Sequence, residues 1–120
     1  MANTPTSISP SALQQLRRLE GAVPYVYDDG DGTWPKRKIT SYATKGHATI
    51  GVGHLIKPEE REYFKRYMGG PEMPEQEMLA LLGKDVQAHA HPLRAKIRVP
   101  ITQSMWDALV LQAFNTGPYT

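Results

Sequence analysis

Cysteine is absent from the 120 residues of this sequence, and long apolar runs are absent as well. Without cysteine there is no disulfide framework, no thiolate nucleophile and no cysteine-ligated zinc, so stability must come from packing. No apolar run approaches the roughly 20 residues that span a bilayer, and we expect no membrane span. The first ten residues, MANTPTSISP, show no basic segment followed by an apolar one. We therefore expect no signal peptide, and export would need another route.

A large excess of either charge is also missing. The sequence has 14 Lys and Arg against 12 Asp and Glu, a net charge of +2 and a pI near 8.9. Such mild basicity is compatible with a bacterial envelope or with nucleic acid as a partner and demands neither. Because there is no dense basic stripe, we expect no nucleic-acid partner. A nucleic-acid-binding domain would instead show tight binding that weakens steeply with salt.

The length and the 40% hydrophobic content fit one domain over residues 1–120. Between residues 22 and 54, β-branched and aromatic residues with glycines predict short strands or hairpins. Apolar residues at helical spacing predict helices over residues 10–20, from residue 58 to the glycines at 69 and 70, over 74–90 and over 103–115.

Local signals mark where several of these helices begin and end. Ser9 and Thr102 are typical N-cap residues, and Pro92 is expected to kink or end the third helix. In the first helix, Leu16 and Leu19 continue an apolar stripe that begins at Leu13.

Glu20 stands at the end of the first predicted helix, directly before Gly21, which stops it. It continues the stripe of Leu13 and Leu16 and lies in the last turn, where the helix dipole is negative. Burial and the dipole both favour a protonated carboxyl group, which can act as a general acid. Asp29 falls instead in a polar, glycine-rich turn that favours the ionised form. Two carboxyl groups in such contrasting environments suit glycoside hydrolysis.

A structural interpretation of the same two residues stays open at this point. A glutamate at the edge of an amphipathic helix usually faces solvent, and Asp-Asp-Gly is common turn chemistry. The two residues alone therefore do not decide between catalysis and structure.

Four motifs in a fixed order favour the catalytic interpretation. They cover most of the chain from about Leu13 onward and keep Glu20 and Asp29 nine positions apart. Together they resemble the phage-type lysozymes of glycoside hydrolase family 24, the endolysins and muramidases. The motifs are Glu20-Gly21, Tyr27-x-Asp29, Thr49-Ile50-Gly51-x-Gly53-His54, and Thr102-Gln103 leading to Asp107-Ala108-Leu109 and Phe114-Asn115-x-Gly117.

The resemblance implies a role for three residues. Glu20 would be the general acid, Asp29 would act on the opposite face of the sugar, and Thr49 would help hold the attacking water. The implied reaction is hydrolysis, with inversion, of the β-1,4 bond between N-acetylmuramic acid and N-acetylglucosamine in peptidoglycan, leading to cell-wall lysis. No metal and no organic cofactor is implied. Such a protein is made in the host bacterial cytoplasm and acts in the periplasm or cell wall after release or delivery.

The implied fold is α+β and mainly helical, a lysozyme-like fold with a small β-hairpin region. Residues 1–57 would form the N-terminal helix and β region, with a hairpin insertion at about 30–47, and residues 58–120 an incomplete helical lobe. Gly51 and Gly53 are candidate substrate-binding residues, and Tyr27 would either line the sugar cleft or pack under it. His54 is expected to be buried and structural, in an ion pair with Asp85.

The sequence departs from the family pattern in two places. Nineteen residues separate Asp29 from Thr49, where only a handful is typical. This surplus carries Lys36, Arg37, Lys38 and Lys45, which could meet anionic envelope polymers, although a solvated hairpin tip is the favoured interpretation.

The second departure is that family members continue beyond residue 120 with further helices. The apolar face from Met105 to Phe114 would then lack part of its cover, so we expect an exposed patch, a covering partner or a missing segment. An immunity or inhibitor protein is a further candidate partner. These departures keep alternatives open: a catalytically impaired peptidoglycan-binding or particle-structural module, or a fragment that needs its C-terminal part.

Overall fold

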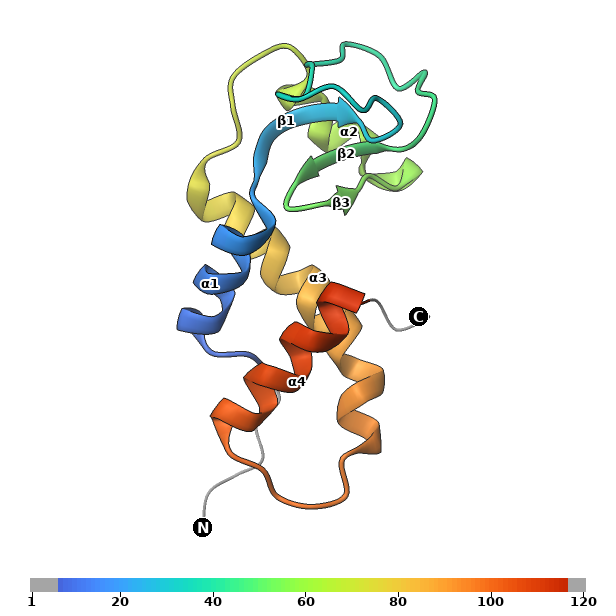
Figure 1. Ribbon diagram of the computed structural model, residues 1–120. Helices are drawn as coiled ribbons and strands as arrows, with labels where there is room; N and C mark the ends of the chain where they lie inside the picture. The colour runs from blue at the N-terminus through green and yellow to red at the C-terminus, as the bar shows by residue number, and fades with distance from the viewer. Residues whose placement is uncertain (1–6, 117–120) are drawn as a thin grey trace. The chain divides into compact units, whose positions relative to one another are not determined.

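The computed structural model describes residues 7–116 (Figure 1). It confirms a mainly helical α+β fold with a small antiparallel sheet. The chain divides into two compact units, which are described separately. The sheet unit is residues 20–81, and the helical unit is the chain up to Leu19 together with the chain from Leu82 onward. The expected boundary at residue 57 stays a prediction.

The elements follow one another in a simple order along the chain. The strands are β1 (Val23–Asp28), β2 (Ala48–Gly51) and β3 (His54–Leu55), and the α-helices are α1 (Pro10–Glu20), α2 (Arg61–Phe64), α3 (Glu75–Lys96) and α4 (Gln103–Thr116). Two 3₁₀ turns, η1 (Pro58–Glu60) and η2 (Lys65–Tyr67), flank α2. No helix within residues 7–116 is long and apolar enough to cross a membrane.

The sheet has the order β1-β2-β3 with antiparallel pairing throughout. Tyr27 lies opposite Thr49, and Ile50 lies opposite His54. The turn between β2 and β3 is tight because Gly51 and Gly53 take positive φ angles of 70° and 72°, which other residues adopt at a cost. The two glycines of the sequence motif therefore allow the chain to reverse direction between the strands.

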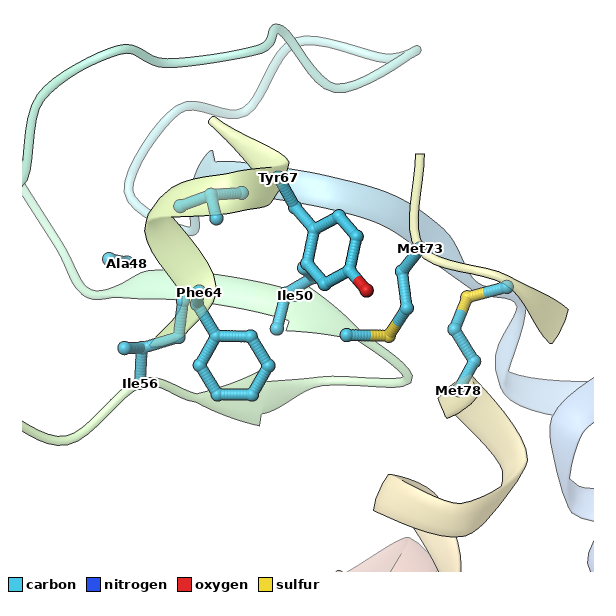
Figure 2. Packing of buried hydrophobic residues seen from close by; sticks show 8 residues of the cluster. Ala48, Ile50, Ile56, Phe64, Tyr67, Met73 and Met78 are labelled. Carbon is cyan, nitrogen blue, oxygen red and sulfur yellow. The ribbon is translucent and has the colours of Figure 1, made fainter. Parts of the chain in front are cut away.

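A buried cluster holds the sheet to the segment that follows it (Figure 2). Ile50 from β2 packs with Phe64, Tyr67 and Met73, and the start of α3 adds Met78. The hydroxyl of Tyr67 donates to Glu77 Oε1 at 2.5 Å, and burial followed by this contact raises the pKa of Tyr67. In place of the single helix predicted from residue 58, the structure has the short helix α2 between the 3₁₀ turns η1 and η2.

The long connection between β1 and β2 is not the predicted hairpin. Residues 30–47, all of them described, contain no strand and form an irregular loop. The loop turns back along the free edge of β1, where the N–H of Ile39 donates to the carbonyl of Val26 at 3.1 Å. The hydroxyl of Tyr25 also donates to the carbonyl of Lys36. The loop therefore covers a strand edge that would otherwise expose unpaired backbone groups.

The basic residues of this loop make local contacts. The Lys36 ammonium lies 5.6 Å from the centre of the Tyr27 ring and donates to the carbonyl of Asp31 at 3.0 Å. Lys38 lies 5.4 Å from the centre of the Tyr25 ring. Binding of anionic envelope polymers by these residues stays a prediction.

Both predicted N-caps of the helical unit are confirmed. Ser9 Oγ accepts from the N–H of Ala12 at 3.2 Å, and Thr102 Oγ1 accepts from the N–H of Met105 at 3.2 Å. Ser9 Oγ also donates to Asp107 Oδ2 at 2.6 Å, which links α1 to α4. Burial opposes the charge on Asp107, but the hydrogen bonds from Ser9 and Gln103 outweigh it and lower its pKa.

The long helix α3 begins in the sheet unit and continues in the helical unit. It does not end at Pro92 but runs on to Lys96. In the helical unit it buries Leu82, Val86 and Ala90, the stripe that helical spacing predicted.

The stripes on α1 and α4 are narrower than expected. Leu16 is buried, whereas Leu19 is 67% exposed. In α4, Met105 and Leu109 are 52% and 40% exposed, so an exposed apolar patch is present on part of the predicted face. The side chain of Asn115 and the expected stop at Gly117 and Pro118 lie outside the described residues.

Candidate active site

Asp29 directly follows β1 and is held by the end of the long loop. Its backbone N–H donates to the carbonyl of His47 at 3.0 Å, and its Oδ1 accepts from the backbone N–H of His47 at 2.5 Å. Its Oδ2 lies 3.4 Å from Nδ1 of the His47 imidazole. The Asp29 side chain is still 35% exposed, so water or a substrate can reach the carboxylate.

Thr49 lies two residues beyond His47, in β2. Its hydroxyl donates to the carbonyl of His47 at 2.9 Å, the same carbonyl that accepts from Asp29. A hydroxyl that donates its proton to a carbonyl keeps its lone pairs, which can accept a hydrogen from water. The residue is only 2% exposed, so it also anchors this end of the strand. The structure thus brings Asp29 and Thr49 together through the backbone of His47.

Asp28, the neighbour of Asp29, has a different environment. Its carboxylate accepts from the backbone N–H groups of Lys45 at 2.8 Å, Gly30 at 2.9 Å and Gly46 at 3.0 Å. These bonds, with the one from Lys45 the largest effect, lower the pKa of Asp28. Two adjacent aspartates therefore have separate surroundings: Asp28 is surrounded by backbone donors, and Asp29 keeps part of its carboxylate open.

Glu20 is the last residue of α1, and Gly21 follows it with a φ of +74°. The predicted burial of Glu20 is wrong, because the side chain is exposed. The stripe on α1 ends earlier than spacing suggested, as the exposed Leu19 next to it also shows. Its role as general acid stays a prediction.

Tyr27 lies near the end of β1. It is buried, and burial followed by the charge of Asp29 raises its pKa. Gly51 is buried as well, and a Cβ there would lie 3.8 Å from Leu81 and 3.9 Å from Met78. Gly53 is exposed at the tip of its turn. The backbone explains both glycines, and substrate binding by any of the three residues stays a prediction.

His54 is buried, as expected, and has a partner that the sequence did not suggest. Its Nε2 lies 3.0 Å from Glu60 Oε1, which also accepts from the N–H of Lys57 at 3.0 Å. Burial opposes the charge on Glu60, but these contacts outweigh it and lower its pKa. The predicted ion pair with Asp85 involves a residue of the helical unit and stays a prediction.

Sequence reasoning missed His47 and Gly46. His47 contacts both Asp29 and Thr49, and a Cβ on Gly46 would collide with Asp29 Oδ1. The contacts with Asp29 join positions 17 or 18 apart, so no local pattern in the sequence indicates them. Within the described part of the chain, no group of His, Asp and Glu is gathered as a metal site would be.

This chain is similar in sequence to one endolysin and in fold to two solved structures. The endolysin of Salmonella phage P22 is 28% identical over 110 residues, which are 92% of this chain and 63% of the endolysin. A crystal structure of a P22 lysozyme variant matches with a TM-score of 0.63 at 25% identity, over 95% of this chain and 66% of the lysozyme. The muramidase domain of SpmX from Asticaccaulis excentricus shares the fold, with a TM-score of 0.61 and 24% identity over 92% of this chain and 59% of that domain's chain.

This chain therefore spans just under two thirds of the length of these relatives. The family described as phage lysozyme matches residues 17–120, a segment that contains Glu20, Asp29 and Thr49. The resemblance seen in the motifs is confirmed: the chain belongs to the phage lysozyme family.

Proposed function

We propose that this protein is a peptidoglycan hydrolase, a muramidase that cleaves the β-1,4 bond between N-acetylmuramic acid and N-acetylglucosamine. The observation that carries the proposal is that the backbone N–H of Asp29 and the hydroxyl of Thr49 both donate to the carbonyl of His47. Together with the preceding Glu20, these residues keep the order of the family to which the chain belongs. The site thus offers a carboxylate and a hydroxyl that can act on one water molecule.

The proposed reaction needs three roles. Glu20 gives its proton to the glycosidic oxygen while the bond from that oxygen to the anomeric carbon breaks. Water attacks the anomeric carbon from the opposite face, and its proton passes to the Asp29 carboxylate. Thr49 accepts a hydrogen from the same water and so orients it. One product gains the hydroxyl at the anomeric carbon, with inversion, and the other keeps the oxygen as a free hydroxyl.

Solvent exposure of Glu20 sets a requirement on this scheme. The bound glycan must cover the Glu20 carboxyl group, so that its proton passes to the glycosidic oxygen and not to water. Substrate binding would therefore complete the acid side of the site, while the Asp29 side is already ordered in the free protein.

The biological setting follows from the same proposal. In this proposal the muramidase is made in a bacterial cytoplasm and reaches the periplasm or cell wall after release or delivery. Peptidoglycan is the partner, and an immunity or inhibitor protein that covers the site is a second candidate partner. Lysis of the cell wall is the expected consequence.

A second candidate function is a catalytically impaired peptidoglycan-binding or particle-structural module. One observation favours it: the side chain of the proposed general acid, Glu20, is exposed. Such a module would bind sacculi without releasing soluble fragments.

Purified peptidoglycan sacculi separate the two candidates. We expect the parent chain to solubilise them and Glu20→Gln to be inactive, because the amide keeps the shape but cannot donate the proton. Glu72→Gln, at an exposed loop position of the sheet unit, is the matched control and should lyse like the parent. Binding without lysis by folded parent protein would contradict the hydrolase proposal and support the binding module.

A further inference from the structure

The end of the long loop presents three consecutive backbone N–H groups to the two aspartates after β1. The N–H groups of Lys45 and Gly46 donate to Asp28 at 2.8 and 3.0 Å, and the N–H of His47 donates to Asp29 Oδ1 at 2.5 Å. Hydrogen bonds from amides to a carboxylate are the stronger kind, because the acceptor is charged. The two carboxylates therefore bind a continuous stretch of backbone that returns from a loop of nineteen residues.

Close backbone contact makes this arrangement specific. A Cβ on Gly46 would collide with Asp29 Oδ1 and would lie 2.6 Å from the backbone nitrogen of Gly30. A Cβ on Gly30 would likewise lie 2.6 Å from the backbone nitrogen of Gly46, so both positions need glycine for the chain segments to approach each other. Gly32, in the same loop, has nothing within 4 Å of an added Cβ, so the restriction is local to the aspartates.

Asp28 is the residue that ties the loop end to β1. It takes two of the three donors, and it also takes the N–H of Gly30 at 2.9 Å, which fixes the start of the loop. The remaining donor, His47, is bonded directly to residue 46, so the place of its N–H depends on where Asp28 holds that segment.

We propose that Asp28 is a positioning residue, whose carboxylate holds Lys45 and Gly46 so that the His47 N–H fixes the Asp29 carboxylate for attack by water. The proposal rests on the proposed function of Asp29. It makes the long loop an integral part of the active site and not an appendage. The charged or titratable groups around the pair are Lys45, His47, Tyr27 and Lys36.

Two variants break the arrangement, and each has a matched control in the same loop. Asp28→Asn removes a charged acceptor, and Asp31→Asn makes the same chemical change at an aspartate that binds Thr33 instead. Gly46→Ala adds a methyl group against Asp29, and Gly32→Ala adds one in open space. Thermal melting of the full chain shows that each variant is folded.

The first measurement does not depend on activity. Hydrogen exchange of the His47 amide, followed by NMR, should be about tenfold faster in Asp28→Asn than in the parent, since a bond to a charged group no longer holds this segment. Asp31→Asn should leave this exchange rate unchanged.

The second measurement is kcat and KM on soluble peptidoglycan glycan chains. Displacement of Asp29 should lower kcat about 100-fold in Gly46→Ala and somewhat less in Asp28→Asn, with KM near that of the parent. Unchanged exchange and unchanged kcat in folded Asp28→Asn would overturn the proposal, as would an equal loss in Asp31→Asn. If the parent itself shows no hydrolysis, the proposed function fails, and the exchange rates alone decide whether Asp28 positions Asp29.

Discussion

Two connections in the sheet each join neighbouring antiparallel strands, but their conformations are fixed in different ways. The turn from β2 to β3 reverses the chain within a few residues, and its shape comes from glycines with positive φ angles. The connection from β1 to β2 takes nineteen residues to join strands that are also antiparallel neighbours. A tight turn is fixed by local backbone preference, whereas the long loop needs side chains to hold its ends, and Asp28 and Asp29 supply them.

The difference between the connections explains where the candidate site lies. The short turn presents no carboxylate and packs Gly51 against Met78 and Leu81. The long loop brings backbone donors to two aspartates and leaves one of them partly open. The same set of hydrogen bonds therefore orders the long loop and positions a candidate catalytic group.

Asp29→Asn tests the long connection with the largest expected effect. Loss of the group that accepts the proton from water should lower kcat by about 10³-fold or more, since general base catalysis contributes about 10²–10⁴. The amide can still accept the His47 N–H, so the melting temperature should stay close to that of the parent. Initial rates on purified sacculi measure the effect, and a rate above a tenth of the parent's would contradict the role given to Asp29.

Gly53→Ala tests the short connection. Because nothing lies within 4 Å of the added methyl, the cost is that of the positive φ alone, about 1–2 kcal/mol in the free energy of unfolding. Urea denaturation measures it. Gly32→Ala, in the long loop and without such a φ, should stay within about 0.5 kcal/mol of the parent. Equal losses in the free energy of unfolding for Gly53→Ala and Gly32→Ala would contradict the proposed difference between the two connections.

Tyr25→Phe tests how firmly the long loop is held along β1. It removes the hydroxyl that donates to the carbonyl of Lys36 and should cost about 1 kcal/mol of stability. Urea denaturation gives the change. An unchanged free energy of unfolding would mean that this contact does not hold the loop in solution.

The pH dependence of stability gives the smallest and most selective effect. The pKa of Asp28 is lowered, below its ordinary value of 3.8, chiefly by the N–H of Lys45, and that of Asp31 is lowered chiefly by the hydroxyl of Thr33. A lowered folded-state pKa adds stability above the ordinary value, and this stability is lost as the pH falls through the folded-state pKa. Urea midpoints between pH 6 and pH 3 should therefore fall less steeply in Asp28→Asn than in the parent. Parallel curves would contradict the hydrogen bonds assigned to Asp28.

Local sequence signals predicted much of the fold. Ser9 and Thr102 cap their helices because an N-cap acts on amides within three residues, and the Leu82, Val86 and Ala90 stripe follows from helical spacing. The same spacing could not tell how far a stripe extends, so Leu19 and Glu20 were expected to be buried and are exposed.

From the sequence, only the carboxylate and the hydroxyl of the candidate site could be predicted. Asp29 and Thr49 were named from motifs, but the contact that joins them runs through His47, which no motif marks. The need for glycine at position 46 depends on a collision with a residue 17 positions earlier. Such requirements arise from tertiary contact and have no local pattern in the sequence.

The anomeric configuration of the first product tests the central claim most directly. Proton NMR of a soluble peptidoglycan glycan, followed from the first turnover before mutarotation, distinguishes the two anomers. The account predicts cleavage at the N-acetylmuramic acid linkage with the α-anomer formed first, because Asp29 activates a water on the face opposite Glu20. Formation of the β-anomer first would contradict it, since Asp29 would then attack the sugar itself, and so would the absence of any cleavage by the folded protein.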